Sequence, residues 1–417
     1  MKAIRILRPL GVRDFALLWS GMTVSALGDG IYTVALAWQV YGLSNTPTAL
    51  SVVGVAWFVP QLAATLFGGV IADRVDRRRV MIFADVLRGV AIGALGFLSV
   101  AGELRLWHVW VLVALYGTGT SVFLPAYTAL VPQVLSKEQL VEAASLRQFV
   151  RPLATRIIGP ALGGALVAAL GAGTGFLIDA GSFSASALAI VLMTARPPVR
   201  AEGRSVGSVF REMGEGVKFV LGQRWLWTTL LAVTLGMVFY LGPLYVLVPF
   251  VIKNHLHGGA DGLGFVLAAG GLGALVASLA TGQRGSSRRP LVVVYLTWAV
   301  ACFGLVGYSL VEKVWEAALV SAVATGSLVT GQILWETLMQ HSVPGELLGR
   351  VASLDWFVSS GLVPASFAIT GPVADGIGAL TTLRWSGVLA GGVLIGFLVL
   401  LLSLRATRVH GVEAVRG

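Results

Sequence analysis

The chain has 417 residues, of which 56% are apolar and only 12% are charged. Soluble domains carry about 25% charged residues, so this composition excludes a soluble globular protein and indicates an integral membrane protein. The net charge of +10 would suggest a nucleic-acid partner for a soluble protein; in a membrane protein it indicates cytoplasmic loop arginines beside anionic lipid, and we expect no nucleic-acid binding.

Twelve apolar segments are each long enough to cross a bilayer, which takes about 20 mainly apolar residues. The first is too long for a signal peptide and carries Asp29 near its middle, so we interpret it as a span. We therefore predict an all-α integral membrane protein with twelve transmembrane helices. The segments cover residues 14–41, 48–72, 79–101, 106–131, 141–169, 173–195, 225–252, 260–282, 290–311, 314–342, 347–373 and 379–404.

A hydrophilic stretch, residues 196–224, separates the first six segments from the last six. We expect an N-terminal six-helix bundle in residues 1–195, a cytoplasmic linker in 196–224, a C-terminal six-helix bundle in 225–404 and a cytoplasmic tail in 405–417. Within the linker, apolar residues recur at helical spacing over 208–221, which predicts an amphipathic helix at the membrane surface.

Lysine and arginine are distributed unevenly along the loops. With the N-terminus inside, the inner segments carry 22 of these residues and the outer loops carry 4. Because cytoplasmic loops are enriched in lysine and arginine, we predict a multi-pass protein of the inner or plasma membrane with both termini in the cytoplasm.

The two halves repeat a pattern. Val131-Pro132 ends the fourth segment and Gly159-Pro160 follows 28 residues later; Val343-Pro344 ends the tenth segment and Gly371-Pro372 follows at the same distance. Duplicated six-helix halves place a substrate site between them near the bilayer midplane. We therefore expect two pseudo-symmetric bundles with such a site.

A charged turn joins the second and third segments. Asp73 stands where its own helix should end, and a carboxylate is unfavourable at that negative pole. A better partner would be another helix's N-terminus or a neighbouring arginine, so the turn is a candidate cytoplasmic latch. The alternative is an ordinary cytoplasmic loop that collects arginine. The candidate latch residues are Gly69, Asp73, Arg74, Arg77 and Arg78.

These motifs resemble those of the major facilitator superfamily, in the twelve-helix drug/proton antiporter type that includes macrolide and siderophore exporters. The charged turn is similar to the superfamily's loop motif, although Asp76 stands where glycine is usual. Leu27-Gly28-Asp29 resembles a motif of the exporter branch. Many such exporters carry an arginine in helix four, whereas residues 106–131 contain none. The resemblance implies a monomer. The residues that resemble the antiporter motif of helix five are Gly159, Pro160, Gly163 and Gly164.

Ionisable residues inside apolar segments are functional candidates, because a charge in the membrane is costly unless it is paired or faces water. Asp29 is a candidate proton carrier; the alternative is permanent neutralisation by an arginine of the fifth segment. Asp85 and Arg88, three residues apart, can pair locally, and we interpret them as structural. The candidates for proton coupling or cavity charge are Asp29, Arg147, Arg151, Arg156, Asp179, Glu336 and Asp355.

The fifth segment carries three of these charges. Arg147 and Arg151 lie four residues apart on one helix face, where like charges repel, so acids or an anionic substrate should lie opposite. Symmetry places Asp355 at the depth of Arg147, which allows either an ion pair between the halves that opens during transport or a static pair. We expect Arg156 to be the most buried of the three. Glu336 either titrates or binds a cationic drug, or simply faces a cytoplasmic vestibule.

Polar and aromatic residues at middle depths form a second set. The helix-five glycine–proline motif should bend its helix and allow close approach to a neighbour, either to seal a cavity or as ordinary packing. The candidate cavity lining for an amphiphilic, ring-containing molecule consists of Tyr32, Trp38, Gln39, Trp57, Gln61, Tyr116, Tyr240, Gln332 and Trp335.

These observations favour a secondary active transporter that exports an amphiphilic drug, antibiotic or siderophore-like molecule by alternating access against proton entry. A facilitator or importer of a metabolite or lysolipid is the alternative. A membrane-embedded enzyme or sensor is a remote one, because the chain has a single cysteine, scattered histidines and no phosphate-binding loop. We expect no metal site and no cofactor. The cavity arginines would favour anions and its acids and aromatics would favour cations, so the charge of the substrate is left open.

Overall fold

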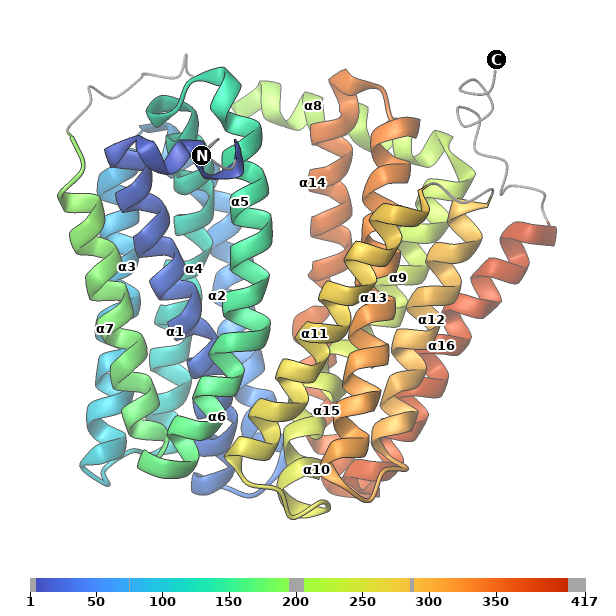
Figure 1. Ribbon diagram of the computed structural model, residues 1–417. Helices are drawn as coiled ribbons and strands as arrows, with labels where there is room; N and C mark the ends of the chain where they lie inside the picture. Colours follow the sequence, from blue (N-terminus) through green and yellow to red (C-terminus); the bar gives the residue numbers. More distant parts are fainter. Residues whose placement is uncertain (1–4, 75, 195–205, 286–288, 404–417) are drawn as a thin grey trace. The chain divides into compact units, whose positions relative to one another are not determined.

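The computed structural model consists of helices, without a strand in the part of the chain that it describes (Figure 1). Eleven described helical segments are long and apolar enough to cross a membrane. α1 (Arg13–Leu43) is long enough as well, but Asp29 and its other polar residues make it less apolar than these eleven. The predicted all-α membrane fold is confirmed. The description covers residues 5–74, 76–194, 206–285 and 289–403, and their side chains except those of 5, 65–74 and 206–213.

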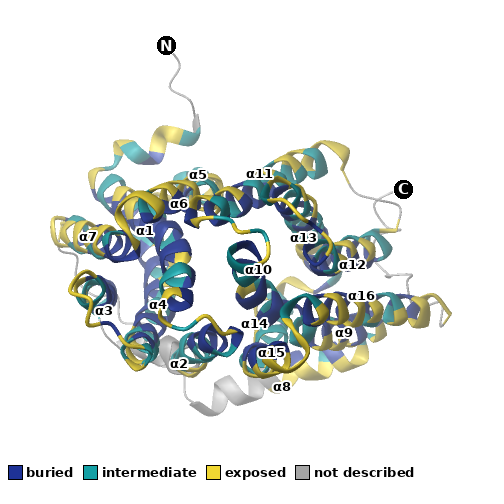
Figure 2. Cartoon of the chain, turned by 90° about the horizontal axis from the view of Figure 1, so that it is seen from below, coloured by how far each residue is buried: buried dark blue, intermediate teal, exposed yellow. Residues whose placement is uncertain are grey.

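The chain divides into two compact units. The first comprises Met1–Gly203 together with Ile252–Ala268, and the second comprises Arg204–Val251 together with Ala269–Gly417. In both units the buried residues lie where helices of the unit face one another (Figure 2).

The first unit contains six of the predicted spans, the fifth of which is built from α5, a π-helical segment and α6. Its elements are a short 3₁₀ helix (Arg5–Gly11), α1, α2 (Pro47–Arg74), α3 (Arg77–Val100), α4 (Leu106–Val134), α5 (Leu140–Pro152), the π-helical segment (Leu153–Ile158), α6 (Gly159–Leu170) and α7 (Ala172–Val191).

The second unit contains the remaining spans, while residues at the end of α10 and the start of α11 group with the first unit. The predicted segments differ from the observed ends by no more than four residues. The elements are α8 (Val206–Gly222), α9 (Arg224–Gly242), a π-helical segment (Pro243–Leu247), α10 (Val248–Asn254), α11 (Ala260–Arg284), α12 (Pro290–Tyr308), α13 (Val314–Ser342), α14 (Gly345–Gly361), α15 (Val363–Ile377) and α16 (Ala379–Ser403).

Proline and glycine accompany the helix interruptions in both units. Proline removes a backbone donor, and the helix adjusts locally; the π-helical segments lie just after Pro152 and begin at Pro243. Gly171, with φ of +81°, joins α6 directly to α7, and Gly378, with φ of +89°, joins α15 directly to α16. These left-handed conformations favour glycine because it has no Cβ. A glycine therefore makes the turn between the last two spans of each unit, whereas the two π-helical segments lie in spans that do not correspond in the repeat.

The charged turn before α3 is described only on its α3 side. Asp76, which stands where glycine is usual, accepts a hydrogen bond from the Arg78 backbone N–H at 2.8 Å and so caps α3. Arg78 donates to the Ile190 carbonyl at the end of α7 at 2.9 Å, and Arg77 donates to the Ala129 carbonyl of α4 at 3.3 Å. The carbonyl of Ile190 lies in the last turn of α7, so the helix dipole stabilises the charge of Arg78 there. The side chains of the other candidate latch residues, Gly69, Asp73 and Arg74, lie outside the described residues.

The helix expected in the linker is present as α8. Its Glu215 forms an ion pair with Arg350 of α14, and a Cβ at Gly216 would lie 3.3 Å from the Cβ of Arg350. α8 is therefore attached to α14 within the second unit, and its position at a membrane surface stays a prediction.

Candidate functional site

Asp29 lies at the middle of α1 and faces α4. Its Oδ1 accepts a hydrogen bond of 2.7 Å from the Tyr116 hydroxyl, and the side chain is half-buried. The Tyr32 ring packs on the Tyr116 ring at a centroid distance of 4.7 Å. Two residues predicted to line a cavity therefore surround the predicted proton carrier.

A second carboxylate from α7 lies beside Asp29. Asp179 is 0% exposed, its Oδ1 accepts a hydrogen bond of 3.2 Å from Ser182, and its Oδ2 has no hydrogen-bond partner among the described residues. The charges of Asp29 and Asp179 interact. A Cβ at Gly28 would lie 3.0 Å from the Ser182 Cβ and closer still to Asp179. The glycine that precedes Asp29 is therefore what allows α7 to bring its carboxylate against α1.

A buried ion pair from α3 completes this cluster. Arg88 is 4% exposed and pairs with Asp85, which is 0% exposed. The Arg88 guanidinium lies between the rings of Phe123 of α4 and Phe183 of α7, at 4.5 and 4.4 Å from their centroids. The local pairing predicted for Asp85 and Arg88 is confirmed, and the cation–π contacts stabilise the buried charge.

Arg88 places a guanidinium against the fourth span although that span lacks an arginine. A Cβ at Gly119 of α4 would lie 2.8 Å from the Cγ of Arg88, so glycine at this position leaves room for the arginine. The Arg88 charge also interacts with that of Asp179. We call Asp29, Asp85, Arg88 and Asp179 the charge cluster. It contains three carboxylates and one guanidinium, and Asp85 already pairs with that guanidinium.

The arginines of the fifth span do not pair with Asp29 among the described residues. Arg147 is half-buried, with its guanidinium 5.9 Å from the centroid of the Tyr127 ring. Arg151 and Arg156 are exposed. The expectation that Arg156 is the most buried of the three is wrong. It lies in the π-helical segment Leu153–Ile158, where the wider turn changes the direction of side chains from that of a regular α-helix.

The helix-five motif brings its helix very close to α1 and α11. A Cβ at Gly159 would lie 2.7 Å from the Gly30 Cα, and one at Gly163 would lie 2.8 Å from the Ile31 Cα. A Cβ at Gly164 would lie 3.0 Å from the Cα of Gly264 in α11. The predicted close approach is confirmed, and it fixes α6 beside the residues that flank Asp29.

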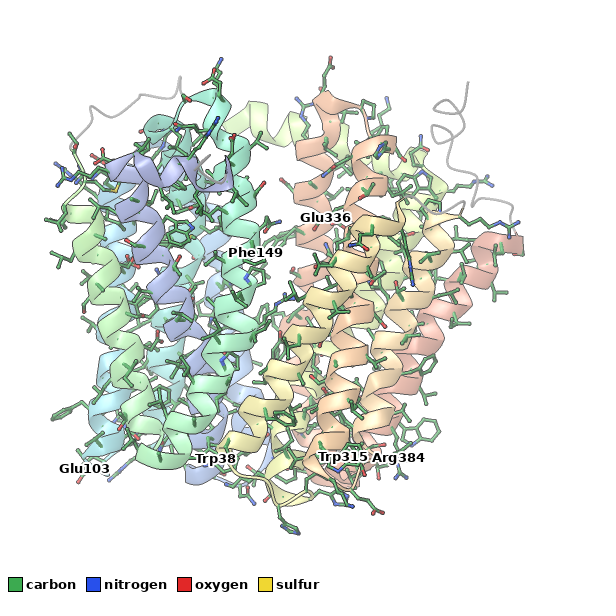
Figure 3. All side chains as sticks on the ribbon, in the orientation of Figure 1. Trp38, Glu103, Phe149, Trp315, Glu336 and Arg384 are labelled. Carbon is green, nitrogen blue, oxygen red and sulfur yellow. The ribbon has the colours of Figure 1, made fainter. Side chains whose placement is uncertain are left out.

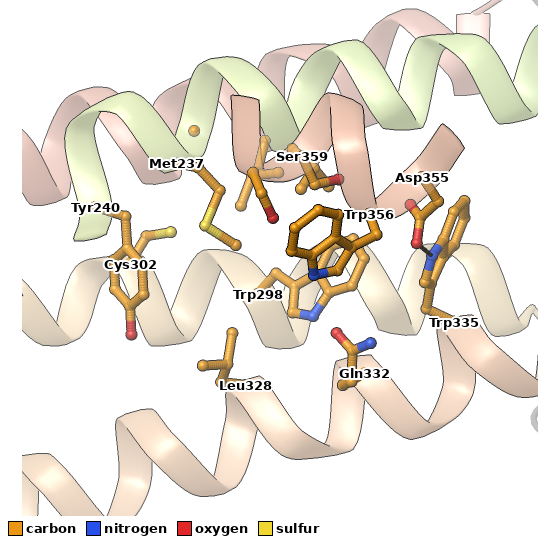
Figure 4. A pocket seen from close by; sticks show the side chains of 14 residues that line it. Met237, Tyr240, Trp298, Cys302, Leu328, Gln332, Trp335, Asp355, Trp356 and Ser359 are labelled. Carbon is orange, nitrogen blue, oxygen red and sulfur yellow. Dashed lines mark hydrogen bonds between the residues drawn. The ribbon is translucent and has the colours of Figure 1, made fainter. Parts of the chain in front are cut away.

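The second unit contains a separate pocket with about 790 Å³ of space free of protein atoms, its open mouth included (Figure 4). The predicted residues Tyr240, Gln332, Trp335 and Asp355 all line it. The Trp335 indole N–H donates to Asp355 Oδ2 at 3.5 Å. Lining residues that the sequence analysis did not identify include Met237, Trp298, Trp356, Ser359 and Ser360. The only sequence signal for Trp298 and Trp356 was an indole inside an apolar segment.

Glu336, labelled in Figure 3, lies on α13 one helical turn from the pocket residue Gln332. It is exposed and accepts a hydrogen bond of 3.0 Å from the Gln332 side chain, and its charge interacts with that of Asp355. We call the pocket, with Glu336 at its edge, the aromatic pocket.

The other predicted lining residues have individual contacts within the first unit. The Trp38 ring lies 5.7 Å from the Lys253 ammonium, and Gln39 accepts a hydrogen bond of 2.9 Å from Ser99. The Trp57 ring packs on Phe58 at 4.8 Å, and Gln61 is half-buried. The contacts of Trp38 and Gln39 tie α1 to α10 and α3, whereas the Trp57–Phe58 contact lies within α2.

The known proteins to which this chain is similar are membrane transporters. A family described as transmembrane secretion effector matches residues 5–414. The chain is 25% identical over 380 residues to macrolide efflux protein A of Streptococcus pyogenes, which covers 90% of this chain and 93% of that protein. It is 29% identical over 368 residues to the enterobactin exporter EntS of Salmonella choleraesuis, covering 87% and 83%. A bacterial homologue of the iron transporter ferroportin has the same fold, with a TM-score of 0.67, 16% identity, and 95% and 99% coverage.

Proposed function

Since the chain belongs to the transmembrane secretion effector family of the major facilitator superfamily, we propose that it exports an amphiphilic small molecule by alternating access, driven by proton entry. Export is supported by relatives named for the efflux of macrolides and of enterobactin. The observation that carries proton coupling is the charge cluster, in which Asp29 and Asp179 lie together in an apolar bundle with one guanidinium that Asp85 already engages.

In the proposed mechanism the proton enters at Asp29. This carboxylate is half-buried, whereas Asp179 is fully buried, so Asp29 is the more accessible of the two. Two carboxylates close together in a low dielectric repel one another, and in the proposed cycle the uptake of one proton relieves this repulsion. The Tyr116 hydroxyl donates to Asp29 and orients its carboxylate.

Arg88 supplies the fixed charge of the cycle. An arginine remains protonated inside proteins, and its guanidinium is held by Asp85, Phe123 and Phe183. Loss of the proton leaves excess negative charge in the cluster, and uptake removes it. A proton shifts the equilibrium between inward and outward states only if it binds one of them more tightly. We propose that the loaded and unloaded cluster favour opposite states.

The remaining features of the proposal follow from composition and family. We propose a monomer in the plasma or inner membrane with both termini in the cytoplasm, whose partners are its substrate, protons and lipid. We also propose that it performs transport without covalent chemistry on the substrate.

Proton coupling is tested by the variants Asp29→Asn and Asp179→Asn in proteoliposomes with a labelled macrolide antibiotic. Each variant should abolish the accumulation of macrolide driven by a pH gradient. In proteoliposomes loaded with unlabelled macrolide at equal pH, each should preserve the exchange of labelled for unlabelled macrolide, since exchange needs no net proton movement. Glu103→Gln, which removes an exposed acid of the same unit (Figure 3), is the matched control. Undiminished gradient-driven transport in Asp29→Asn would eliminate Asp29 as the carrier.

The direction of transport is tested separately in everted membrane vesicles. Export from the cell appears there as uptake into the vesicle when its interior is acidified. Release from preloaded vesicles under the same gradient would instead support an importer.

A further inference from the structure

The aromatic pocket of the second unit is an open recess in the helix bundle. Its residues come from α9, α12, α13, α14 and α16, so it is built between packed helices. Its interior volume of about 190 Å³ is smaller than the roughly 300–1,000 Å³ of pockets that enclose a drug-sized ligand. A ligand here would therefore be held on one side by the wall of the recess and would extend out of its mouth.

The wall of the pocket is formed by large aromatic rings held in place by one another. The Trp335 ring packs against the Trp298 ring at a centroid distance of 6.0 Å, and against Trp225 behind it at 5.9 Å. Trp335 and Trp298 are buried, whereas Trp356 is 44% exposed. Two indoles are therefore fixed by packing, and a third offers its surface to a ligand.

The charge of the pocket has one sign. Asp355 is the only charged residue among those that line it, and Glu336 adds a second carboxylate at its edge. Within the part of the chain that the structure describes, the Asp355 carboxylate accepts one hydrogen bond, the long one of 3.5 Å from Trp335. Arg350, on the same helix α14, is engaged by Glu215 of α8. No basic side chain lines the pocket among the described residues, so the second unit itself supplies no countercharge there.

These three properties select one class of ligand. Indole faces attract cations, and tryptophan does so more strongly than other side chains. A carboxylate without a local countercharge attracts a cation and repels an anion. Apolar rings on the ligand would replace water on the wall. We infer that the aromatic pocket binds an organic cation that carries apolar rings, with its positive charge between Asp355 and the face of Trp356.

This inference deepens the proposed function, on which it rests for the statement that the bound cation is exported. It also separates two tasks: the first unit takes the proton, and the second unit takes the substrate. Binding itself requires no transport, so the two proposals can be tested apart.

The test uses two probes of nearly the same shape and opposite charge, tetraphenylphosphonium and tetraphenylborate. Equilibrium dialysis of the purified full-length protein in detergent measures binding, and the difference between variants removes the contribution of probe dissolved in micelles. The wild type should bind the cation more tightly than the anion. Asp355→Asn should weaken cation binding roughly tenfold and leave anion binding unchanged or stronger, whereas Asp355→Glu should retain most of the cation affinity.

A second pair of variants tests the aromatic contribution. Trp356→Phe keeps a ring and should lose little cation affinity, while Trp356→Leu keeps apolar surface but removes the ring and should weaken cation binding several-fold. Glu346→Gln, which removes an exposed acid of the same helix that does not line the pocket, is the matched control. Thermal unfolding checks that each variant is folded.

The outcomes separate the proposals. Unchanged cation affinity in both Asp355→Asn and Trp356→Leu, or equal binding of the two probes by the wild type, would overturn the inference while leaving gradient-driven export untouched. Loss of cation affinity in Asp355→Asn together with failure of export in the vesicle experiment would leave the pocket standing and overturn the exporter.

Discussion

The two units of this protein have the same order of spans and turns but differ in what they bury. All charged side chains that are buried among the described residues lie in the first unit: Asp14, Asp85, Arg88 and Asp179. The buried polar residues of the second unit are serines and threonines, and its charge is placed at the partly open aromatic pocket. The repeated helical framework therefore carries the charge cluster in one unit and the aromatic pocket in the other.

The frameworks themselves remain alike where helices approach closely. In the first unit a Cβ at Gly30 of α1 would lie 2.7 Å from the Gly159 Cα of α6. In the second unit Gly242 of α9 donates its backbone N–H to the Ser366 hydroxyl of α15 at 2.8 Å. Close contact of this kind depends on a residue without a side chain. The difference between the units thus lies in their side chains rather than in their helix arrangement.

The largest loss of stability should appear when the buried arginine of the first unit, Arg88, is removed. Arg88→Gln leaves Asp85 without its ion partner in an apolar bundle, and such a change costs about 3–5 kcal/mol. Thermal or denaturant unfolding in detergent measures the loss. The double variant Arg88→Gln, Asp85→Asn should recover part of it, because no unpaired charge remains; a double variant as unstable as the single one would contradict this reason.

A smaller loss of stability should follow when the space beside Asp29 is filled. Gly28→Ala introduces a Cβ where Asp179 and Ser182 now lie, and overpacking of this kind costs about 1–3 kcal/mol. Gly42→Ala on the same helix is the control, because no other atom lies within 4 Å of a Cβ there. Equal unfolding temperatures of the two variants would show that α1 and α7 can move apart without cost.

The division of tasks between the units is tested by measuring cation binding in the Asp29→Asn variant and gradient-driven transport in the Asp355→Asn variant. Asp29→Asn should change tetraphenylphosphonium affinity less than about twofold, whereas Asp355→Asn should lower it roughly tenfold, which corresponds to about 1.4 kcal/mol. In proteoliposomes at saturating tetraphenylphosphonium, Asp355→Asn should retain the dependence of transport on the pH gradient. A loss of cation affinity in Asp29→Asn as large as in Asp355→Asn would show that one site performs both tasks.

The smallest effect is expected at the exposed ion pair of the second unit. Arg350 and Glu215 have side-chain exposures of 31% and 53%, and such pairs contribute about 0–1 kcal/mol. Arg350→Gln should therefore shift the unfolding temperature far less than Arg88→Gln. A comparable shift would mean that the attachment of α8 to α14 matters more for stability than exposure suggests.

Part of the candidate site could be predicted from single residues. The sequence identifies Asp29 and Asp179 as candidates because an acid inside an apolar span is costly. It also predicts that Asp85 pairs with Arg88, because the two residues are one helical turn apart. The partner of Asp29 could not be predicted this way. The sequence offered three arginines of the fifth span, and the structure gives the Tyr116 hydroxyl.

Length, hydropathy and motif spacing determined the spans, the repeat and the family, because a membrane helix needs an apolar run and each signal is local along the chain. Membrane helices are apolar on nearly all faces, so the sequence pattern does not reveal which face of each helix turns inward. Only the tertiary structure decided that Arg88 reaches α4 through the space at Gly119, and that Trp298, Trp335 and Trp356 meet at Asp355. Such contacts depend on the rotation and spacing of neighbouring helices, which are set by packing between segments far apart in the chain.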